Sequence, residues 1–458
     1  MCTLKPLVSV YIANHNYGRY IEQAITSVLE QTLQSFEIII IDDGSKDGSS
    51  EIIERYGTHE KIMAVFQQNK GLTATNNIAI RAASGKYIMR LDADDYLDPH
   101  ALEVMSGFLE RNPDVGLVFS DYFHVDKDGE VLEMVRRHNF DDVSLYDQPA
   151  HGACTMIRRD CLRSIDGYDE SFRCQDGWDL WVRFIQHYNV QNVNLPLFYY
   201  RQHGSNLTRN EKMLLDTRAE ILKKAALSAE RRLKCVAVIP ARGKATDPHS
   251  QALRPLGGKP LVDWTIKAAI EAKTVSAIIF SSPDLELREH VQQRFGSEVV
   301  VVARDWKKAL PNSSLDETLT EAMNAYPKAD RNYDALATLF IESPFRSARY
   351  IDMALDVMAM FDSQRVIGVR PETDTFYRHN GKGLRPLNQS RLLKLEKEEL
   401  FRQVGNFNVL RRGHFLKDSM SAGEKVGHIV LDRMAAISLN TEWDWDVADA
   451  YIKSSTSN

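Results

Sequence analysis

Short apolar runs recur along the first half of the chain, and segments with helical periodicity separate them. Strands that are apolar throughout are buried on both faces, and their alternation with helices is typical of a parallel sheet covered by helices on both sides. Such sheets bind ligands at the carboxyl ends of their strands. The predicted strands are Val8–Ile12, Glu37–Ile41, Ile62–Phe66 and Gly85–Leu91, and the predicted helices are Tyr20–Gln31, Ser49–Tyr56 and Leu72–Ala83.

The pattern breaks near Thr208, and a second α/β series starts at Cys235. Residues 209–232 between them are rich in Lys, Arg, Glu, Ala and Leu, which predicts one exposed helix with apolar positions at Leu214, Ile221, Leu222 and Ala225. We therefore expect two Rossmann-like α/β domains joined by a charged helix. The predicted division is residues 1–208, a helical linker over 209–232 with the boundary near residue 230, and residues 233–458. In the second series the predicted strands are Cys235–Pro240, Val275–Phe280, Val299–Val302 and Ala335–Ile341, and the predicted helix is Pro260–Ala272.

The bulk composition excludes several classes of function. The 458 residues carry a net charge of −6 without a dense basic run, so we expect no general affinity for nucleic acid or anionic membranes. No apolar run reaches the length of a membrane span, and the N-terminus lacks the apolar segment of a signal peptide. Five scattered cysteines indicate reduced thiols. We expect a cytoplasmic protein without a membrane span.

Three carboxylates lie within four residues at Asp92-Ala93-Asp94-Asp95, directly after a predicted strand. Carboxylates this close repel one another, and a hard divalent cation with oxygen ligands relieves that repulsion. The cluster therefore predicts a Mg²⁺ or Mn²⁺ site that holds a phosphate-bearing substrate. An isolated cluster of this kind is also compatible with a solvated acidic turn.

Four segments of the first half, taken in order, resemble a family 2 glycosyltransferase of the GT-A fold over residues 6–208. Residues 8–16 (VSVYIANHN) are similar to the first strand and base-binding loop of that family, with Ala13 where proline is usual. Residues 41–49 (IDDGSKDGS) match its acidic turn, and residues 69–72 (NKGL) and 91–95 (LDADD) complete the order. The resemblance implies that a nucleotide sugar contacts Ala13, Asn14, Asn16, Asp42, Lys70, Asp92 and Ala93, and that Asp94 binds the metal.

Residue types in these segments suit such roles. Asp42 ends a predicted strand, where its carboxylate can accept from a pyrimidine N–H or from ribose hydroxyls. The segment Asp42-Asp43-Gly44-Ser45 also suits a turn followed by a helix N-cap, and the two interpretations are compatible.

The resemblance also implies a catalytic base. An inverting transfer needs a group that takes the proton of the acceptor hydroxyl. Residues 175–181 (QDGWDLW) are similar to the family segment in which Glu-Asp opens a helix, with Gln175 in place of Glu and Asp176 at the catalytic carboxylate. The competing interpretation is that Asp176 only caps the helix that follows. Residues 200–203 (YRQH) resemble a later segment, where His203 would be a metal ligand or touch the diphosphate; a surface histidine is the alternative.

The second half resembles the cytidylyltransferases that make CMP-activated acidic sugars, through residues 238–243 (VIPARG), 254–261, 343–346 and 439–445. Its phosphate-binding loop departs from the family: between Arg242 and Arg254 only Lys244 is basic, and Asp247 would repel a triphosphate. Asn440 replaces the metal-binding Asp of the family, and Glu342 replaces a small hydroxyl residue. We expect this half to be catalytically inactive and to form a homodimer, since the family forms dimers.

Three functions remain open from the sequence. The leading prediction is a metal-dependent inverting glycosyltransferase that moves a sugar from a nucleotide-sugar donor, with a UDP-sugar favoured, to a glycan or other hydroxyl acceptor in surface or spore polysaccharide synthesis. The second is a bifunctional enzyme that makes a CMP-activated sugar and transfers it. The third is a non-catalytic scaffold for glycan enzymes, which the intact Asp42, Asp92, Asp94 and Asp176 disfavour.

Overall fold

The structure of the protein is a computed structural model, in which the chain forms two compact units that are described separately. The first unit contains Met1–Asn210 and Asp374–Glu398, and the second contains Glu211–Thr373 and Glu399–Asn458. Within the described residues, no helix has both the length and the apolar character needed to cross a membrane. The described residues are 5–136, 152–172, 174–202, 211–228, 232–244, 246–310, 313–326, 332–372, 376–379, 381, 383–386, 400–415 and 425–456.

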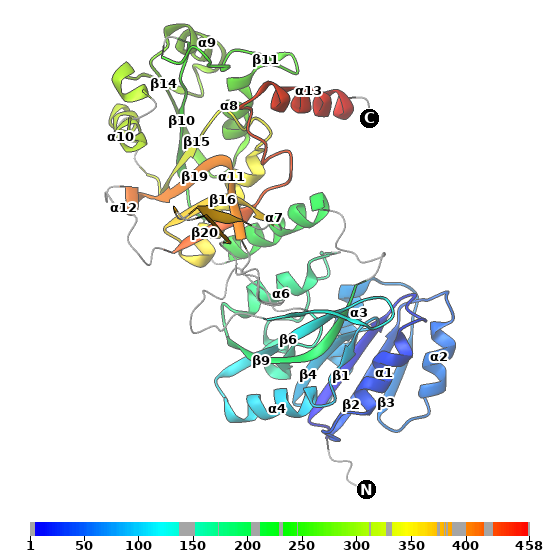
Figure 1. The fold of residues 1–458 in the computed structure, drawn as a ribbon. Helices are drawn as coiled ribbons and strands as arrows, with labels where there is room; N and C mark the ends of the chain where they lie inside the picture. Colours follow the sequence, from blue (N-terminus) through cyan, green and yellow to red (C-terminus); the bar gives the residue numbers. More distant parts are fainter. Residues whose placement is uncertain are drawn as a thin grey trace. The chain divides into compact units, whose positions relative to one another are not determined.

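The first unit is built on a mixed sheet with the strand order β3-β2-β1-β4-β8-β6-β9-β5, and β7 pairs with β6 (Figure 1). The strands from β3 to β4 are parallel, as the sequence predicts. Beyond these predicted strands the sheet is mixed, since β6 pairs antiparallel with β7 and β8 and parallel with β9. The elements are β1 (Val8–Asn14), α1 (Ile21–Leu29), β2 (Phe36–Asp42), α2 (Ser49–Tyr56), β3 (Ile62–Phe66), α3 (Leu72–Ala82), β4 (Tyr87–Asp92), β5 (Tyr96–Leu97), α4 (Ala101–Arg111), β6 (Val115–Val125), β7 (Val131–Val135), β8 (Met156–Arg158), α5 (Arg159–Ser164), α6 (Asp176–Phe184) and β9 (Asn189–Arg201), with the hairpin β17 (Tyr377–His379) and β18 (Leu384–Pro386) in the segment 374–398.

Both faces of this sheet are buried. Alternate residues of β1, such as Val10 and Tyr11, belong to different core clusters because successive side chains of a strand point to opposite faces. Helices α1 and α4 pack into the cluster that contains Val10, and α3, α5 and α6 pack into the one that contains Tyr11. The continuous apolar runs in the sequence are the consequence of this double burial.

The strand register places polar side chains in a row at one edge of the sheet. Asn14 at the end of β1 is paired with Asp42 at the end of β2. On the other side of β1, Ala13 is paired with Asp92 at the end of β4. The two acidic segments thus follow β2 and β4, the strands on either side of β1, and their predicted placement at the carboxyl ends of parallel strands is confirmed.

The second unit contains a second mixed sheet, with the order β14-β13-β10-β15-β19-β16-β20. Its strands β14, β13, β10 and β15 are parallel, and the antiparallel strand β19 separates β15 from β16. Two α/β units are thus confirmed. The elements are α7 (Glu211–Ser228), β10 (Cys235–Pro240), β11 (Pro255–Leu256), β12 (Lys259–Pro260), α8 (Leu261–Glu271), β13 (Val275–Ser282), α9 (Leu285–Phe295), β14 (Val300–Ala303), a 3-10 helix (Trp306–Ala309), α10 (Leu315–Ala325), β15 (Ala335–Leu339), α11 (Ala348–Phe361), β16 (Arg365–Glu372), β19 (Leu400–Arg411), α12 (Arg412–Phe415), β20 (Val426–Val430) and α13 (Glu442–Thr456).

Helix α7 is part of the second unit, and this differs from the exposed connecting helix expected over 209–232. It packs along α11, and Ile221 and Leu222 are both 1% exposed. An ion pair between Asp216 and Arg349 joins the same two helices. The charged composition hid this apolar face, because long charged side chains surround a narrow stripe of Leu, Ile and Ala.

A buried carboxyl on α11 gives a prediction for the stability of this unit. Burial and the neighbouring Asp352 raise the pKa of Asp356 to about 7, against the opposing effect of Arg232 and Lys223. The unfolded chain ionises near 3.8, so folding loses stability as pH rises from about 4 to 7. Asp356→Asn is expected to raise the free energy of unfolding at pH 8 by about 1–3 kcal/mol, with a smaller gain at pH 5.5.

Thermal unfolding at the two pH values checks this expectation. Asp362→Asn is the matched control: this exposed carboxylate at the end of the same helix pairs with Arg411, so its loss should change stability by a similar small amount at both pH values. Equal stability of wild type and Asp356→Asn at pH 8 would contradict the assignment.

Candidate active site

Asp42 is held in a dense hydrogen-bond network where β1 and β2 end. Its Oδ1 accepts from Asn14 Nδ2 at 2.8 Å and from Ser45 Oγ at 2.5 Å, and its Oδ2 accepts from Ser50 Oγ at 2.7 Å. The carboxylate is 3% exposed. The network fixes Asp42 at the strand edge, and it gives Asn14 a role in orienting Asp42 beside its expected contact with the donor.

The neighbouring Asp43 anchors a second loop, a role the sequence analysis missed. Its carboxylate accepts from the backbone N–H groups of Lys70 and Gly71, at 2.8 and 2.9 Å. Gly44 allows the two loops to meet, since its φ is +75° and a Cβ there would lie 2.9 Å from the backbone nitrogen of Asn69. Asp43 and Gly71 lie far apart in the sequence, so this contact depends on the fold that brings the two loops together.

Arg90 brings together two carboxylates that are far apart in the sequence. This side chain of β4 donates from Nε to Asp92 Oδ1 at 2.6 Å and from Nη1 to Asp176 Oδ2 at 2.6 Å. The side chain of Arg90 is 8% exposed, and that of Asp176 is 13% exposed. The predicted donor-binding carboxylate and the predicted base thus lie on either side of one guanidinium.

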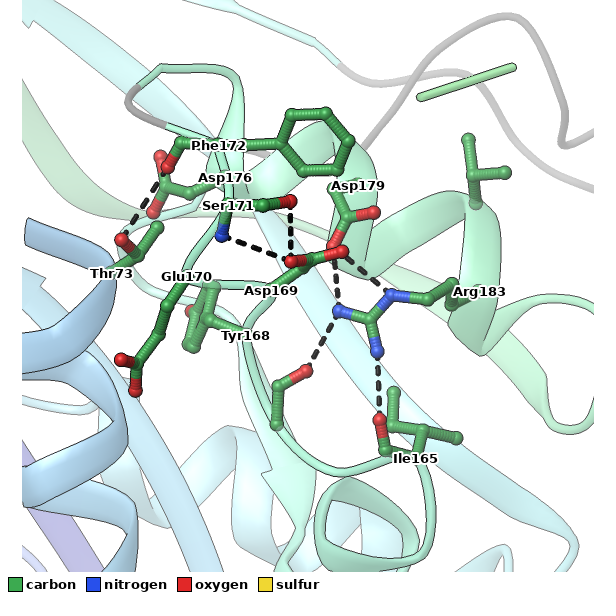
Figure 2. Close-up of polar contacts among 12 residues, drawn as sticks. Thr73, Ile165, Tyr168, Asp169, Glu170, Ser171, Phe172, Asp176, Asp179 and Arg183 are labelled. Atoms are coloured by element: carbon green, nitrogen blue, oxygen red, sulfur yellow. Dashed lines mark hydrogen bonds and ion pairs between the residues drawn. The ribbon is translucent and has the colours of Figure 1, made fainter. Parts of the chain in front are cut away.

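Asp176 is the first residue of α6, and contacts on either side of it orient this helix. Gln175 has a left-handed backbone with φ of 59°, an uncommon conformation that turns the chain into the helix. Figure 2 shows how Arg183 of α6 donates to the carbonyl of Ile165 at 2.7 Å and to Asp179 at 2.6 Å. These contacts join the helix to the turn that precedes the segment 168–172.

The Asp94 and Asp95 carboxylates lie in the turn after β4. Asp95 is 1% exposed, and burial, Asp94 and Asp92 hold its pKa well above the ordinary range. Burial raises the pKa of the Tyr17 phenol, and the negative charge of Asp94 raises it further. Tyr17 therefore lies near the acidic cluster. Oxygen ligands that crowd in a buried site suit a hard divalent cation.

The fit to a metal rests on these carboxylates, since His203 lies outside the described residues. Among the residues that are described, no three His, Cys, Asp or Glu side chains are gathered in a ready-made metal-binding group. Among the described residues, the buried Oδ2 atom of Asp95 has no hydrogen-bond partner. A buried carboxylate oxygen of this kind is compatible with a cation in the turn.

Arg201 holds this turn in place, a role that sequence reasoning missed. Its backbone N–H donates to Asp95 Oδ1 at 2.8 Å, and its Nε donates to the carbonyl of Asp94 at 2.8 Å. The side chain is 2% exposed and lies over the ring of Tyr20. The sequence analysis singled out His203 in the same segment; Arg201 and Asp95 lie far apart in the sequence, so no local signal pointed to their contact.

The remaining predicted donor contacts line the same edge. Ala13 lies within β1, and Ala93 is buried directly after β4. Asn16 has a φ of 63°, and its Oδ1 accepts from the backbone N–H of Lys46 at 2.8 Å. The side chain of Lys70 is exposed, where it is free to reach an anionic ligand.

Comparisons with known proteins decide the family of this site. Residues 9–165 match the model of glycosyl transferase family 2. An uncharacterized glycosyltransferase of Methanocaldococcus jannaschii is 32% identical over 207 residues, which cover 43% of this chain and 71% of that protein. The chain belongs to glycosyltransferase family 2. Residues 236–368 match the cytidylyltransferase family model, so both resemblances seen in the sequence are confirmed.

Other similar proteins match only part of the length of this family 2 chain. The chondroitin synthase of Escherichia coli is 29% identical over 210 residues, which cover 44% of this chain and 30% of the synthase. The chain therefore spans less than a third of the length of that relative. A solved structure of S. aureus TarS 1-349 in complex with UDP is 15% identical, with a TM-score of 0.40, over 47% of this chain and 64% of that chain.

In the second unit, Asn440 and Asp444, where the resemblance places the family's metal site, serve a helix end. Asp444 Oδ2 accepts from the backbone N–H groups of Asn440 and Thr441, at 3.1 and 2.7 Å, at the start of α13. Glu342 lies after β15, and burial raises the pKa of its carboxyl. A capping carboxylate and a buried acid are both poor partners for a triphosphate.

These contacts predict that the second unit does not activate sugars. The full chain incubated with CTP, Mg²⁺ and N-acetylneuraminate is expected to release no pyrophosphate above the rate without protein. A coupled phosphate assay measures the release, with a functional CMP-sugar synthetase as the positive control. Steady pyrophosphate release would instead support the bifunctional enzyme.

Proposed function

We propose that this protein is a metal-dependent inverting glycosyltransferase that moves a sugar from a nucleotide-sugar donor to a hydroxyl group of a glycan or other acceptor. The observation that carries the proposal is the pair of carboxylates held on Arg90. Asp92 lies at a strand end, where the donor of an α/β sheet binds, and Asp176 faces it across the guanidinium.

In this function Asp176 is the general base. Within the described residues both of its side-chain hydrogen bonds, from Arg90 and from Asn76 Nδ2 at 3.2 Å, reach Oδ2. Oδ1 is then the oxygen that takes the proton of the acceptor hydroxyl as the hydroxyl oxygen attacks the sugar. The attack comes from the face opposite the nucleotide, so the anomeric configuration inverts.

The residues at the strand edge bind and orient the donor. Asp42 and Asp92 face the nucleoside and its ribose, and Lys70 supplies a positive charge to the diphosphate. Asp94 would hold Mg²⁺ or Mn²⁺, with His203 as a further ligand. A bound divalent ion offsets the negative charge that develops on the departing nucleoside diphosphate.

The wider role of the chain is part of the same proposal. We favour a UDP-sugar as donor, a cytoplasmic enzyme and an acceptor in surface or spore polysaccharide synthesis. The second unit, with its altered phosphate loop and the capping role of Asp444, acts as a non-catalytic dimerisation domain rather than as a synthetase.

A panel of UDP-, GDP-, dTDP- and CMP-sugars tests the proposal. The full chain with Mn²⁺ should release nucleoside diphosphate from at least one donor, and EDTA should abolish that release. Binding of a donor without turnover in any acceptor mixture would favour the scaffold. Release of CMP as the only product would favour the enzyme that makes and uses a CMP-activated sugar.

A further inference from the structure

Arg90 occupies an unusual position for a residue of a central strand. Its guanidinium is buried within the first unit, where it donates to the carboxylates of Asp92 and Asp176 and lies beside the Tyr168 phenol. The two ion pairs use different nitrogens of the fork, Nε and Nη1. The guanidinium therefore fixes the positions of the two carboxylates relative to each other, which a single point charge cannot do.

Stability alone does not explain this group of three buried charges. Replacing a buried ion triad with apolar residues is often neutral or stabilising, so a sheet gains little stability from Arg90 as such. The flanking positions in β4, Met89 and Leu91, are fully buried apolar residues, as a central strand requires. At Arg90, beside the proposed base, the strand has a buried charged side chain in place of an apolar one.

The surroundings of Arg90 are shaped to hold it in one place. Gly152 lies against it, and a Cβ added at Gly152 would lie 3.3 Å from Arg90 Nη1. Asn76 of α3 donates to the same Oδ2 of Asp176 that Arg90 contacts. Two donors on one oxygen fix the rotation of that carboxylate, which leaves the other oxygen pointing in a defined direction.

We propose that Arg90 is the positioning residue that sets the base Asp176 at a fixed distance from the donor-binding Asp92. Arg90 touches neither donor nor acceptor in this role; it acts on the transfer through Asp176. The inference rests on the proposed function, because it assigns a residue to that reaction.

The test is a double-mutant cycle in the full chain. Arg90→Lys keeps the positive charge but lacks the rigid fork that fixes both carboxylates, so kcat for transfer is expected to fall by about 100-fold, with a smaller change in the donor KM. In the Asp176→Asn background, Arg90→Lys should cause no further loss of the rate constant for transfer, measured under single-turnover conditions with radiolabelled donor. A non-additive cycle is the signature of action through Asp176.

A second variant covers the case in which Arg90→Lys does not fold. Gly152→Ala keeps every charged group and pushes the guanidinium by a few tenths of an ångström. It should lower kcat less than Arg90→Lys does, and it should also have no effect in the Asp176→Asn background. Arg158→Lys is the matched control: Arg158, on β8 of the same sheet, donates to the carbonyls of Val115 on β6 and Leu109 on α4, so its loss should lower the Tm and leave kcat unchanged.

Two results would overturn the inference in distinguishable ways. Equal losses of kcat from Arg90→Lys in the wild-type and Asp176→Asn backgrounds would show that Arg90 acts independently of the base, while donor turnover by the wild type would leave the proposed function standing. Absence of turnover and of nucleoside diphosphate binding in the wild type would overturn the proposed function and this inference together.

Discussion

Replacing Asp176 with asparagine is expected to lower the rate of sugar transfer by about 1,000-fold, because the acceptor hydroxyl loses the group that takes its proton. Asparagine has the same shape and still offers an oxygen to Arg90 Nη1, which Asp176 now accepts from at 2.6 Å. The donor KM should therefore change little. Initial rates at saturating acceptor, with circular dichroism to check folding, measure the effect.

Asp169→Asn is the matched control for this substitution. Asp169 lies in the same segment and accepts from the backbone N–H and the hydroxyl of Ser171, at 3.0 and 2.7 Å (Figure 2). Its loss should leave kcat within a few-fold of the wild type. If Asp176→Asn retains most of the wild-type rate, the base lies elsewhere and Asp176 only begins the helix α6.

The second large effect is expected at Asp94. Asp94→Asn removes a charged oxygen ligand from the proposed cation site, so transfer should fall by at least about 100-fold at moderate Mn²⁺, equivalent to several kcal/mol of transition-state stabilisation. Higher Mn²⁺ should recover part of the rate, since the remaining carboxylates still attract the ion. Titration calorimetry with Mn²⁺ and the nucleoside diphosphate measures the loss of affinity directly.

Asp98→Asn is the control for Asp94→Asn. Asp98 follows the next strand, β5, and its Oδ1 caps a turn by accepting from the backbone N–H of His100 at 2.9 Å. Its rate and its Mn²⁺ affinity should match the wild type. Unchanged Mn²⁺ dependence in Asp94→Asn would remove Asp94 from the metal site and favour the solvated acidic turn.

Much of the fold around the site could be predicted from the sequence because it depends on local patterns. The strand Ile62–Phe66 and the helix Ser49–Tyr56 have the bounds that the apolar periodicity gives. Asp42 and Asp92 were expected at strand ends, and the register confirms that placement. A buried strand followed by acidic residues is a short-range signal, so the sequence contains all of it.

The contacts that organise the site could not be predicted in the same way. Arg90 looks like an ordinary polar interruption of an apolar strand, since its partner Asp176 lies far along the chain. Arg201 and Asp43 likewise act through contacts between loops that only the folded sheet brings together. The antiparallel half of the first sheet and the packed face of α7 also depend on tertiary pairing, which overrides local pattern.

The most direct measurement for the whole account is the anomeric configuration of the transfer product, read by proton NMR at the earliest measurable conversion with the donor selected from the panel. A single displacement assisted by Asp176 predicts a product whose anomeric configuration is opposite to that of the donor. A product that retains the configuration of the donor would contradict the account, because it would leave Asp176 without the role that its pairing with Arg90 supports.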